Sequence, residues 1–180
     1  QSGDPAAEFV VGKLASDFTS SYVSQSGADK TYKVSAGLSR AFKDVEWYDK
    51  TIFSSEKDKA NKVRFQYPDR EFTVEKEGEG DDATWVGTEP YRFRVDDEIV
   101  DEVVGVMTSL NAADIPEQTF DGTGLEDHNI IVQVTGEGLD NTLMVGDAQD
   151  PETEEPLYYA KKGASDNIYL IDGEQKEILD

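Results

Sequence analysis

The segment that most constrains the fold is residues 85–110, which holds the longest clear helical signal in the chain. After Pro90 and a short extended piece, Asp96 is suited to cap a helix, and the acidic residues that follow favour its first turn. The predicted buried stripe of this helix is Ile99, Val103, Val106, Met107 and Leu110. Gly105 costs about 1 kcal/mol relative to alanine there, so we expect it to permit close approach of a strand. We expect the sheets to be built around this helix.

Short segments of alternating polarity predict that most of the remaining chain is β-structure. Residues 62–67 and 71–76 alternate on either side of a Pro-Asp turn, a pattern typical of a hairpin, and 83–87 is expected to add a third strand. The other expected strands are 8–13, 21–25, 31–35, 129–135, 140–145 (ending at Gly146), 157–161 and 167–171. Helical spacing also predicts helices at 37–49 and 174–179. The sequence therefore predicts an α+β protein of antiparallel β meanders and hairpins with two or three packed helices.

The order of several short motifs indicates an internal repeat. The matching pairs are Phe9-Val10-Val11-Gly12 with Leu143-Met144-Val145-Gly146, Tyr22-Val23-Ser24 with Tyr158-Tyr159-Ala160, Gly27 with Gly163, and Tyr32 with Tyr169. Matches in a shared order favour duplication of a β-rich subdomain. Residues 1–53 are then the second half of a first repeat, and residues 54–180 a complete second repeat. The missing half is expected upstream in the natural protein, with residues 9–12 pairing here with strands of the second copy.

The charge of the chain excludes one large class of partners. The sequence carries 39 acidic and 17 basic residues, a formal net charge of -22 at pH 7. Such a charge repels the phosphate backbone of nucleic acids and anionic lipid surfaces, so nucleic-acid binding is not expected. An acidic surface favours solubility, or alternatively binding of cations or of a basic partner.

The sequence contains no cysteine and no long apolar segment, which excludes several kinds of site and makes a membrane-spanning segment unexpected. Without cysteine, disulfides, thiolate metal sites and cysteine nucleophiles are excluded. The sequence has no run of about 18 apolar residues, so no segment in it is expected to span a membrane. The chain opens with Gln1 rather than methionine, which indicates a processed or trimmed piece of something longer.

The densest group of candidate metal ligands lies in the acidic loop 147–155. Its carboxylates are Asp147, Asp150, Glu152, Glu154 and Glu155. Calcium binds about six to eight such oxygens, so calcium is the one ion we consider, with no other cofactor predicted. The EF-hand spacing is absent from this loop, and the alternative interpretation is a solvated acidic segment.

No residue is predicted to be catalytic. His128 is the only histidine, and a triad or a zinc site would need a second His or Cys, so a position in solvent or at a strand end is expected. Paired carboxylates perform glycoside hydrolysis in other proteins, but among 39 acids close pairs arise without function. An acid-carboxylate hydrolase is therefore the least favoured of three hypotheses.

Several segments, taken in order, resemble a bacterial and archaeal family known as domain of unknown function 4340. They are Trp47-Tyr48-Asp49-Lys50-Thr51-Ile52-Phe53, the hairpin 63–75, Trp85-Val86-Gly87-Thr88-Glu89-Pro90, the helix after Asp96, Gly124-Leu125-Glu126-Asp127, Val145-Gly146-Asp147 and Tyr158-Tyr159-Ala160. The resemblance covers nearly the whole chain. Tyr48 stands where the family usually has arginine, and residues 120–125 are a loose form of its Tyr-Gly-Leu-Asp pattern.

This resemblance implies a setting rather than an activity, because the family has no established activity to carry over. Its members look like envelope proteins, commonly with an N-terminal membrane anchor, and some are associated with ABC-type export or gliding-motility systems. We therefore expect a non-catalytic, extracytoplasmic binding or scaffolding domain, anchored to the membrane through a segment outside this sequence. A protein partner is expected, with a membrane transport component as one candidate. The alternative is a ligand- or cation-binding protein that uses the acidic loop 147–155.

Overall fold

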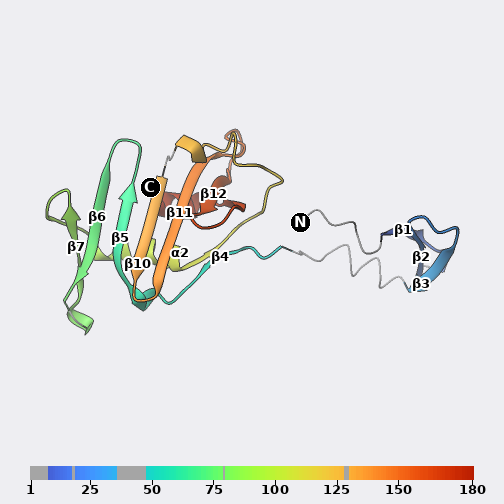
Figure 1. The fold of residues 1–180 in the computed structure, drawn as a ribbon, viewed down its shortest axis with the longest axis horizontal. Helices are drawn as coiled ribbons and strands as arrows, with labels where there is room; N and C mark the ends of the chain where they lie inside the picture. Colours follow the sequence, from blue (N-terminus) through green and yellow to red (C-terminus); the bar gives the residue numbers. More distant parts are fainter. Residues whose placement is uncertain (1–7, 18, 36–47, 79, 128–129) are drawn as a thin grey trace. The chain divides into compact units, whose positions relative to one another are not determined.

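The protein, as described by a computed structural model, consists of two compact units, Gln1–Tyr48 and Asp49–Asp180 (Figure 1). The described residues are 8–17, 19–35, 48–78, 80–127 and 130–180. Within them the protein is α+β, as predicted, with antiparallel sheets and two α-helices. The helix predicted at 37–49 falls mainly on residues 36–47, outside the described residues.

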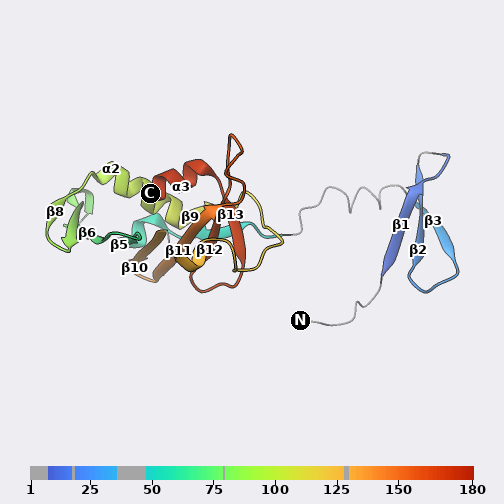
Figure 2. The same cartoon turned by 90° about the horizontal axis from the view of Figure 1, so that it is seen from above.

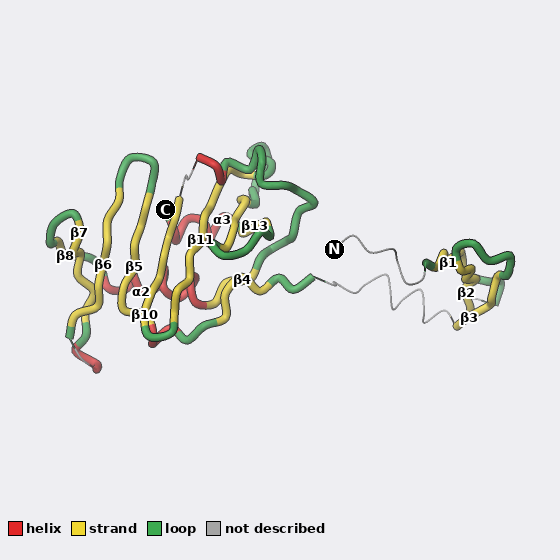
Figure 3. The backbone as a smooth tube through the Cα atoms, in the orientation of Figure 1, coloured by secondary structure: helices red, strands yellow, loops and turns green. Residues whose placement is uncertain are grey.

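An eight-stranded antiparallel sheet forms the frame of the second unit (Figures 1 and 3). From one edge to the other, its strands are β13 (Ile168–Ile171), β12 (Tyr158–Lys162), β11 (Leu139–Ala148), β10 (Ile130–Gly136), β5 (Ala60–Gln66), β6 (Glu71–Glu77), β7 (Thr84–Glu89) and β8 (Phe93–Arg94). Only the β5–β10 pairing joins strands that are not consecutive in the chain. The sheet is therefore two meanders, β5–β8 and β10–β13, joined side by side.

The two faces of this sheet follow the alternation in the sequence. The predicted β5–β6 hairpin is present, and in it Phe65 lies opposite Phe72. Arg64 and Glu71, the charged sequence neighbours of these two rings, lie on the other face, where Arg64 Nη2 is 2.7 Å from Glu71 Oε1. Both of these charged side chains are about half exposed. At this hairpin one face of the sheet is thus solvated, and the other is available to the helices.

Helix α2 (Asp97–Thr108) and helix α3 (Gly173–Leu179) cover the same face of the sheet (Figure 2). Helix α2 starts where predicted, because the Asp96 side chain accepts a hydrogen bond from the Glu98 amide at 3.0 Å. Helix α3 starts at a capping box formed by Asp172 and Gln175.

The buried face of α2 differs in part from the predicted stripe. The buried residues of the helix are Val100, Val103, Val104, Met107 and Thr108. Ile99 was assigned to the stripe, but its side chain is 61% exposed. Leu110 is buried in strand β9 (Ser109–Asn111) and not in the helix, which ends at Thr108. Apolar residues occupy more than one side of α2, so spacing alone did not determine which side meets the sheet.

Two carboxylates of α2 fasten the start of the helix to strand β7. Asp97 Oδ1 accepts a hydrogen bond from the backbone amide of Trp85, and Asp101 Oδ1 accepts one from the indole N–H of Trp85 at 2.9 Å. Trp85 is only 5% exposed, and the bond to Asp101 satisfies its buried N–H. The acidic start of the helix therefore holds a core side chain in place, in addition to any effect on the helix dipole.

A buried amide holds the other end of α2. Asn141 Nδ2, on β11, donates to the Met107 carbonyl at 2.8 Å and to Ser55 Oγ at 3.1 Å. This bond satisfies one of the last carbonyls of the helix, which have no partner within the helix. The chain then enters β9, which pairs with β4 (Thr51–Ser54) in a small second sheet. The sequence-based division at Phe53 falls inside β4.

Both edges of the eight-stranded sheet are protected against pairing with another chain. At β13, the Ala113 amide donates to the Leu170 carbonyl at 2.8 Å, and the Leu170 amide donates to the Asp114 carbonyl at 2.9 Å. At the other edge, β8 has only two residues.

The first unit contains a three-stranded antiparallel meander. Its strands are β1 (Phe9–Leu14), β2 (Ser20–Gln25) and β3 (Thr31–Ser35), close to the predicted bounds. The β1–β2 turn is held by Asp17, whose carboxylate accepts hydrogen bonds from the amides of Thr19 and Ser20 and lies 2.6 Å from Lys33 Nζ. The hydrogen bond from Lys33, followed by that from Thr19, lowers the pKa of Asp17 to about 2.

Gly105 does not have the role expected from the sequence. A Cβ atom added there would meet no atom within 4 Å outside the helix itself, so no strand approaches it closely. At Gly136, by contrast, an added Cβ would overlap the backbone of Lys59 and lie 2.7 Å from its carbonyl carbon.

We expect Gly105→Ala to stabilise the protein by up to about 1 kcal/mol, because alanine is the better helix former and has room. Gly136→Ala should destabilise it by about 1–3 kcal/mol, because the strands must shift. Urea unfolding followed by circular dichroism measures both changes. A loss of stability in Gly105→Ala would contradict the open space described around that residue.

Candidate protein-binding surface

A continuous row of aromatic rings runs from the core of the second unit to the β8 edge. Phe65 stacks on Phe72 with ring centroids 4.6 Å apart, Phe72 meets Phe93 edge-on at 6.1 Å, and Phe93 meets Tyr91 at 6.0 Å. Tyr67 joins the row beside Phe65 and Phe72. Exposure rises along the row, from 5% at Phe65 to 71% at Tyr91. We call these five residues the aromatic row.

The outer part of the aromatic row exists because β7 carries a glycine. Phe93 lies opposite Gly87 in the β7–β8 pairing, and its ring occupies the space where a Gly87 side chain would be, within 2.5 Å of an ideal Cβ position. Any larger residue at position 87 would displace the Phe93 ring. Gly87 therefore allows Phe93 to lie on the sheet and to support Tyr91.

Arginine is concentrated in this part of the sheet. Four of the five arginines in the chain lie between residues 64 and 94, although the net charge of the chain is -22. The Arg70 guanidinium stands 4.3 Å from the centre of the Tyr67 ring, a cation–π geometry. Arg94 is exposed on β8 itself.

Arg92, next to Tyr91, is held by a two-pronged ion pair. Its Nη1 and Nη2 atoms donate to the two carboxylate oxygens of Glu77 at 2.6 and 2.7 Å. The hydrogen bond from Arg92 lowers the pKa of Glu77, and the same bond raises the pKa of Arg92. Both groups are exposed, so the pair orients the guanidinium more than it stabilises the fold.

A shallow hollow of about 460 Å³ adjoins the outer end of the row. The residues lining it are Thr84, Trp85, Val86, Arg92, Phe93, Arg94, Val95 and Asp97. Rigid aromatic side chains and arginine are enriched where proteins bind other proteins, because they offer large contact areas at little entropic cost. The aromatic row, the arginines and this hollow together have the composition of a protein-binding surface.

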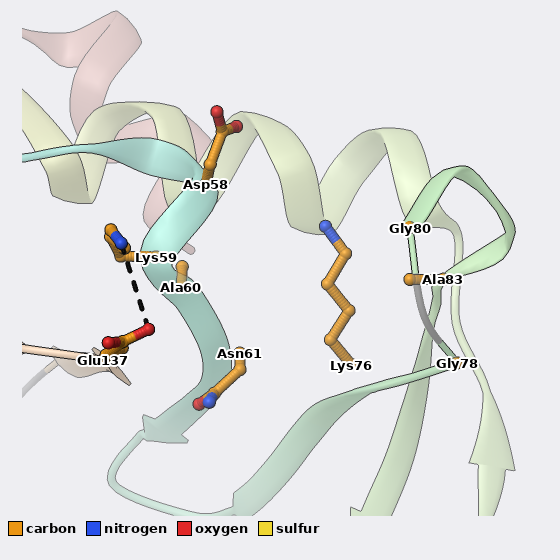
Figure 4. A pocket seen from close by; sticks show the side chains of 9 residues that line it. All are labelled: Asp58, Lys59, Ala60, Asn61, Lys76, Gly78, Gly80, Ala83 and Glu137. Carbon is orange, nitrogen blue, oxygen red and sulfur yellow. Dashed lines mark ion pairs between the residues drawn. The ribbon is translucent and has the colours of Figure 1, made fainter.

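A second, larger hollow of about 860 Å³ lies between β5, β6 and the turn after β10 (Figure 4). Its lining mixes charges of both signs, and Lys59 Nζ lies 3.9 Å from Glu137 Oε2. Figure 4 shows the Asp58 carboxylate pointing away from Glu137. Lys76 is directed toward Trp85, with Nζ 5.5 Å from the ring centre. These side chains do not converge on a common point, so we assign no chemistry to this hollow.

The predicted calcium ligands are spread along β11 and the loop after it. Asp147 lies on β11, and the carboxylate of Asp150 accepts a hydrogen bond from the Glu152 amide at 3.1 Å, which closes a local turn. Glu154 is exposed further along the loop. Among the described residues, no three or more His, Cys, Asp or Glu side chains form a group that could hold a metal ion. Calcium binding by this loop stays a prediction, which thermal melting with and without calcium would test.

Asp147 instead takes part in packing a loop on strand β11. Its amide donates to the Thr123 carbonyl at 2.8 Å, and its carboxylate occupies the space beside Gly124. A Cβ on Gly146 would overlap the Thr123 carbonyl oxygen and lie 2.9 Å from the Leu125 amide. Strand β11 therefore does not end at Gly146, as the sequence suggested, but continues through it to Ala148 with a bulge in its pairing to β12.

Sequence reasoning identified parts of the aromatic row but not the row itself. The hairpin that carries Phe65 and Phe72 followed from the alternation of polar and apolar residues. Tyr91 and Phe93 were placed in an extended connection before the helix, because two residues carry no periodicity. Gly87, which lies opposite Phe93, is the one feature of the sequence that could have indicated the position of this ring. It does so only once the pairing of β7 with β8 is known. His128 lies outside the described residues.

The chain matches the family model described as Domain of unknown function (DUF4340), over residues 1–84 and 85–180, and it belongs to this family. The resemblance noted from the sequence motifs is thereby confirmed. No curated protein and no solved structure matches the chain. In the described part of the chain, no helix has the length and apolar character needed to cross a membrane.

The two outer rings of the row should contribute differently to stability. Phe93→Ala is expected to cost about 2 kcal/mol, less than for a fully buried ring, because it empties the space over Gly87. Tyr91→Ala should change the free energy of unfolding by less than about 0.5 kcal/mol, because the ring is mostly exposed. Urea unfolding compares the two variants. Equal costs would contradict the described packing of Phe93.

The ion pair of Arg92 predicts a dependence on pH. Because the pKa of Glu77 is lowered in the folded protein, the pair stabilises the fold above the ordinary carboxyl pKa and ceases to do so as pH falls through the lowered pKa. In Arg92→Ala, the Glu77 titration measured by NMR should move up toward its ordinary value. Arg64→Ala is the control and should leave Glu77 unchanged. An unchanged titration in Arg92→Ala would show that the pair does not form in solution.

Proposed function

We propose that this protein is a non-catalytic binding or scaffolding module that contacts a protein partner through the outer end of the aromatic row. The observation that carries the proposal is the continuous ring contact from Phe65 to Tyr91, which places a 71% exposed tyrosine on a supported platform. A tyrosine held in this way loses little conformational freedom on binding. Such residues are typical anchors of protein interfaces.

The charges around Tyr91 indicate what the partner surface would resemble. Arg92 is held by Glu77 and Arg94 is exposed, and both follow Tyr91 within three residues of the chain, so two guanidinium groups accompany the aromatic anchor. A partner with an apolar recess for the tyrosine and carboxylates around that recess would fit this arrangement. The strongly acidic remainder of the chain would repel such a partner elsewhere and so orient its approach.

We propose the cell envelope as the setting, on the basis of membership of the family rather than of any feature of the site. Family resemblance implies an extracytoplasmic domain that is anchored to the membrane in the full-length protein. A component of an ABC-type export or gliding-motility system is then the partner we would look for. The proposed cell-envelope setting and the proposed position of the binding surface are independent, and each can be wrong without the other.

Site-specific photo-crosslinking tests the proposed surface. A benzophenone amino acid placed at Tyr91 should, in native cells, give one discrete crosslinked product in the envelope fraction. Tyr48 is a matched control, since it is 67% exposed and the Tyr91 side chain 71% exposed. The same probe at Tyr48 should not give that product. Arg94→Glu should reduce the yield from position 91 by about tenfold, which corresponds to about 1.4 kcal/mol of binding free energy.

Two outcomes would overturn the proposal. Identical products from positions 91 and 48 would indicate non-specific collision. A discrete product from position 91 that is insensitive to Arg94→Glu, and that appears only in the cytosolic fraction, would contradict both the arginine contacts and the envelope setting. Tyr91→Ala, which should leave folding unchanged, provides the variant for any later functional comparison.

A further inference from the structure

The meander of the first unit repeats the pairing of β11, β12 and β13 residue by residue. Pairs in β2–β3 correspond to pairs in β12–β13 at a constant offset, so Val23 opposite Tyr32 corresponds to Ala160 opposite Tyr169. The first strands correspond as well, each with a bulge at one glycine. The pairing with the neighbouring strand shifts between Val11 and Leu14 in β1, and between Val145 and Ala148 in β11.

This register corrects the sequence alignment of the repeat by one residue in the second strand. Tyr22 corresponds to Tyr159, not to Tyr158, because Tyr22 lies opposite Lys33 and Tyr159 lies opposite Leu170. In the first strand, the equivalence of Gly12 with Gly146 agrees with the alignment made from the sequence. The two meanders therefore share strand order, register and bulge.

The corresponding residues differ greatly in burial. Phe9 is 60% exposed and its counterpart Leu143 is 0% exposed. Tyr32 is 56% exposed and its counterpart Tyr169 is 6% exposed. On the opposite face, Tyr22 is 42% exposed where Tyr159 is 9%. The first meander thus presents, on both of its faces, apolar side chains that the second meander buries.

The second unit shows what covers the strand that corresponds to β1. Strand β10 pairs with the edge of β11 that faces away from β12. In this pairing Ile130 lies opposite Val145, and Val132 lies opposite Leu143. In the first unit, β1 pairs with β2, and no other described strand pairs with it. The edge of β1 that corresponds to the β10 side of β11 is therefore unoccupied among the described residues.

The bulge glycine marks a second missing contact. At Gly146, the turn through Thr123 and Leu125 lies so close that a Cβ atom would overlap it. Among the described residues, a Cβ added at Gly12 would meet only atoms of Tyr22, the nearest being the carbonyl oxygen at 3.3 Å. The same bulge thus holds a turn in the second unit, and no described turn lies against it in the first.

We infer that the β1 edge is a docking site for one antiparallel strand of the β10 type, preceded by a glycine-containing turn that seats on Gly12. The strand would add to the sheet through backbone hydrogen bonds and place β-branched aliphatic side chains opposite Phe9, Val10 and Val11. This partner is defined by its chemistry. A second copy of β1 would supply a strand but no turn to fill the space at Gly12, so it fits the site less well.

A synthetic peptide with the sequence of residues 120–136 is the probe, added to the full chain. Backbone amides of β1 that point away from β2 should exchange with deuterium about tenfold more slowly when the peptide is present. Gly12→Ala should abolish this effect, because its Cβ occupies the seat of the turn, while costing the free protein little. Gly105→Ala, a glycine-to-alanine change in the second unit, is the matched control and should retain the effect.

Each other result argues against this docking site. Equal protection by a peptide of shuffled sequence would show non-specific adsorption, and protection of β3 in place of β1 would show that the wrong edge was assigned. Protection of β1 that depends on protein concentration without peptide would identify a second copy as the occupant. If the peptide still slowed exchange of the β1 amides in Gly12→Ala, the turn would not seat on Gly12 as proposed. No protection at saturating peptide would overturn it entirely.

Discussion

The second unit depends on the attachment of helix α2 across two meanders that share only one strand pairing. The helix contacts β7 in the first meander and β10 and β11 in the second, so it bridges both. Trp85 anchors its first turns through Asp97 and Asp101, and Asn141 holds its last carbonyls. Between these ends the buried side chains, among them Met107, contribute about 1.5–3 kcal/mol each. The polar contacts at the two ends of the helix fix its rotation, and so determine that these apolar residues face the sheet.

The position of α2 also determines where the candidate binding surface lies. The start of the helix is tied to the beginning of β7, close to Trp85, and the aromatic row lies toward the other end of the same strands. Rings that extend beyond the helix are only partly covered, so exposure increases along the row toward Tyr91. The sheet edge there is only two residues long, which limits strand addition and leaves side-chain contact as the means of recognition.

The two meanders show that pairing and burial are separate properties of a β-sheet. Their register is the same because it depends on local alternation and on one bulge, which the chain encodes within residues 9–35 and again within residues 139–171. Their burial differs because it depends on elements that are distant in the chain. Leu125, β10 and α2 cover the second meander. The local sequence match therefore predicted where the strands of the first meander lie in the chain, but it did not predict which segments cover them.

The sequence by itself determined the family of the protein, and it also determined most strands, the Asp96 cap and the β5–β6 hairpin. These depend on interactions between residues close in sequence, whose periodicity is visible without a structure. Only the tertiary structure decided that Ile99 faces solvent, that β11 continues past Gly146, and that Phe93 lies over Gly87 to support Tyr91. The physical reason is the same in each case. A helix with apolar residues on several sides, a glycine in a strand and a two-residue edge strand each permit several arrangements, and contacts with distant segments select one of them.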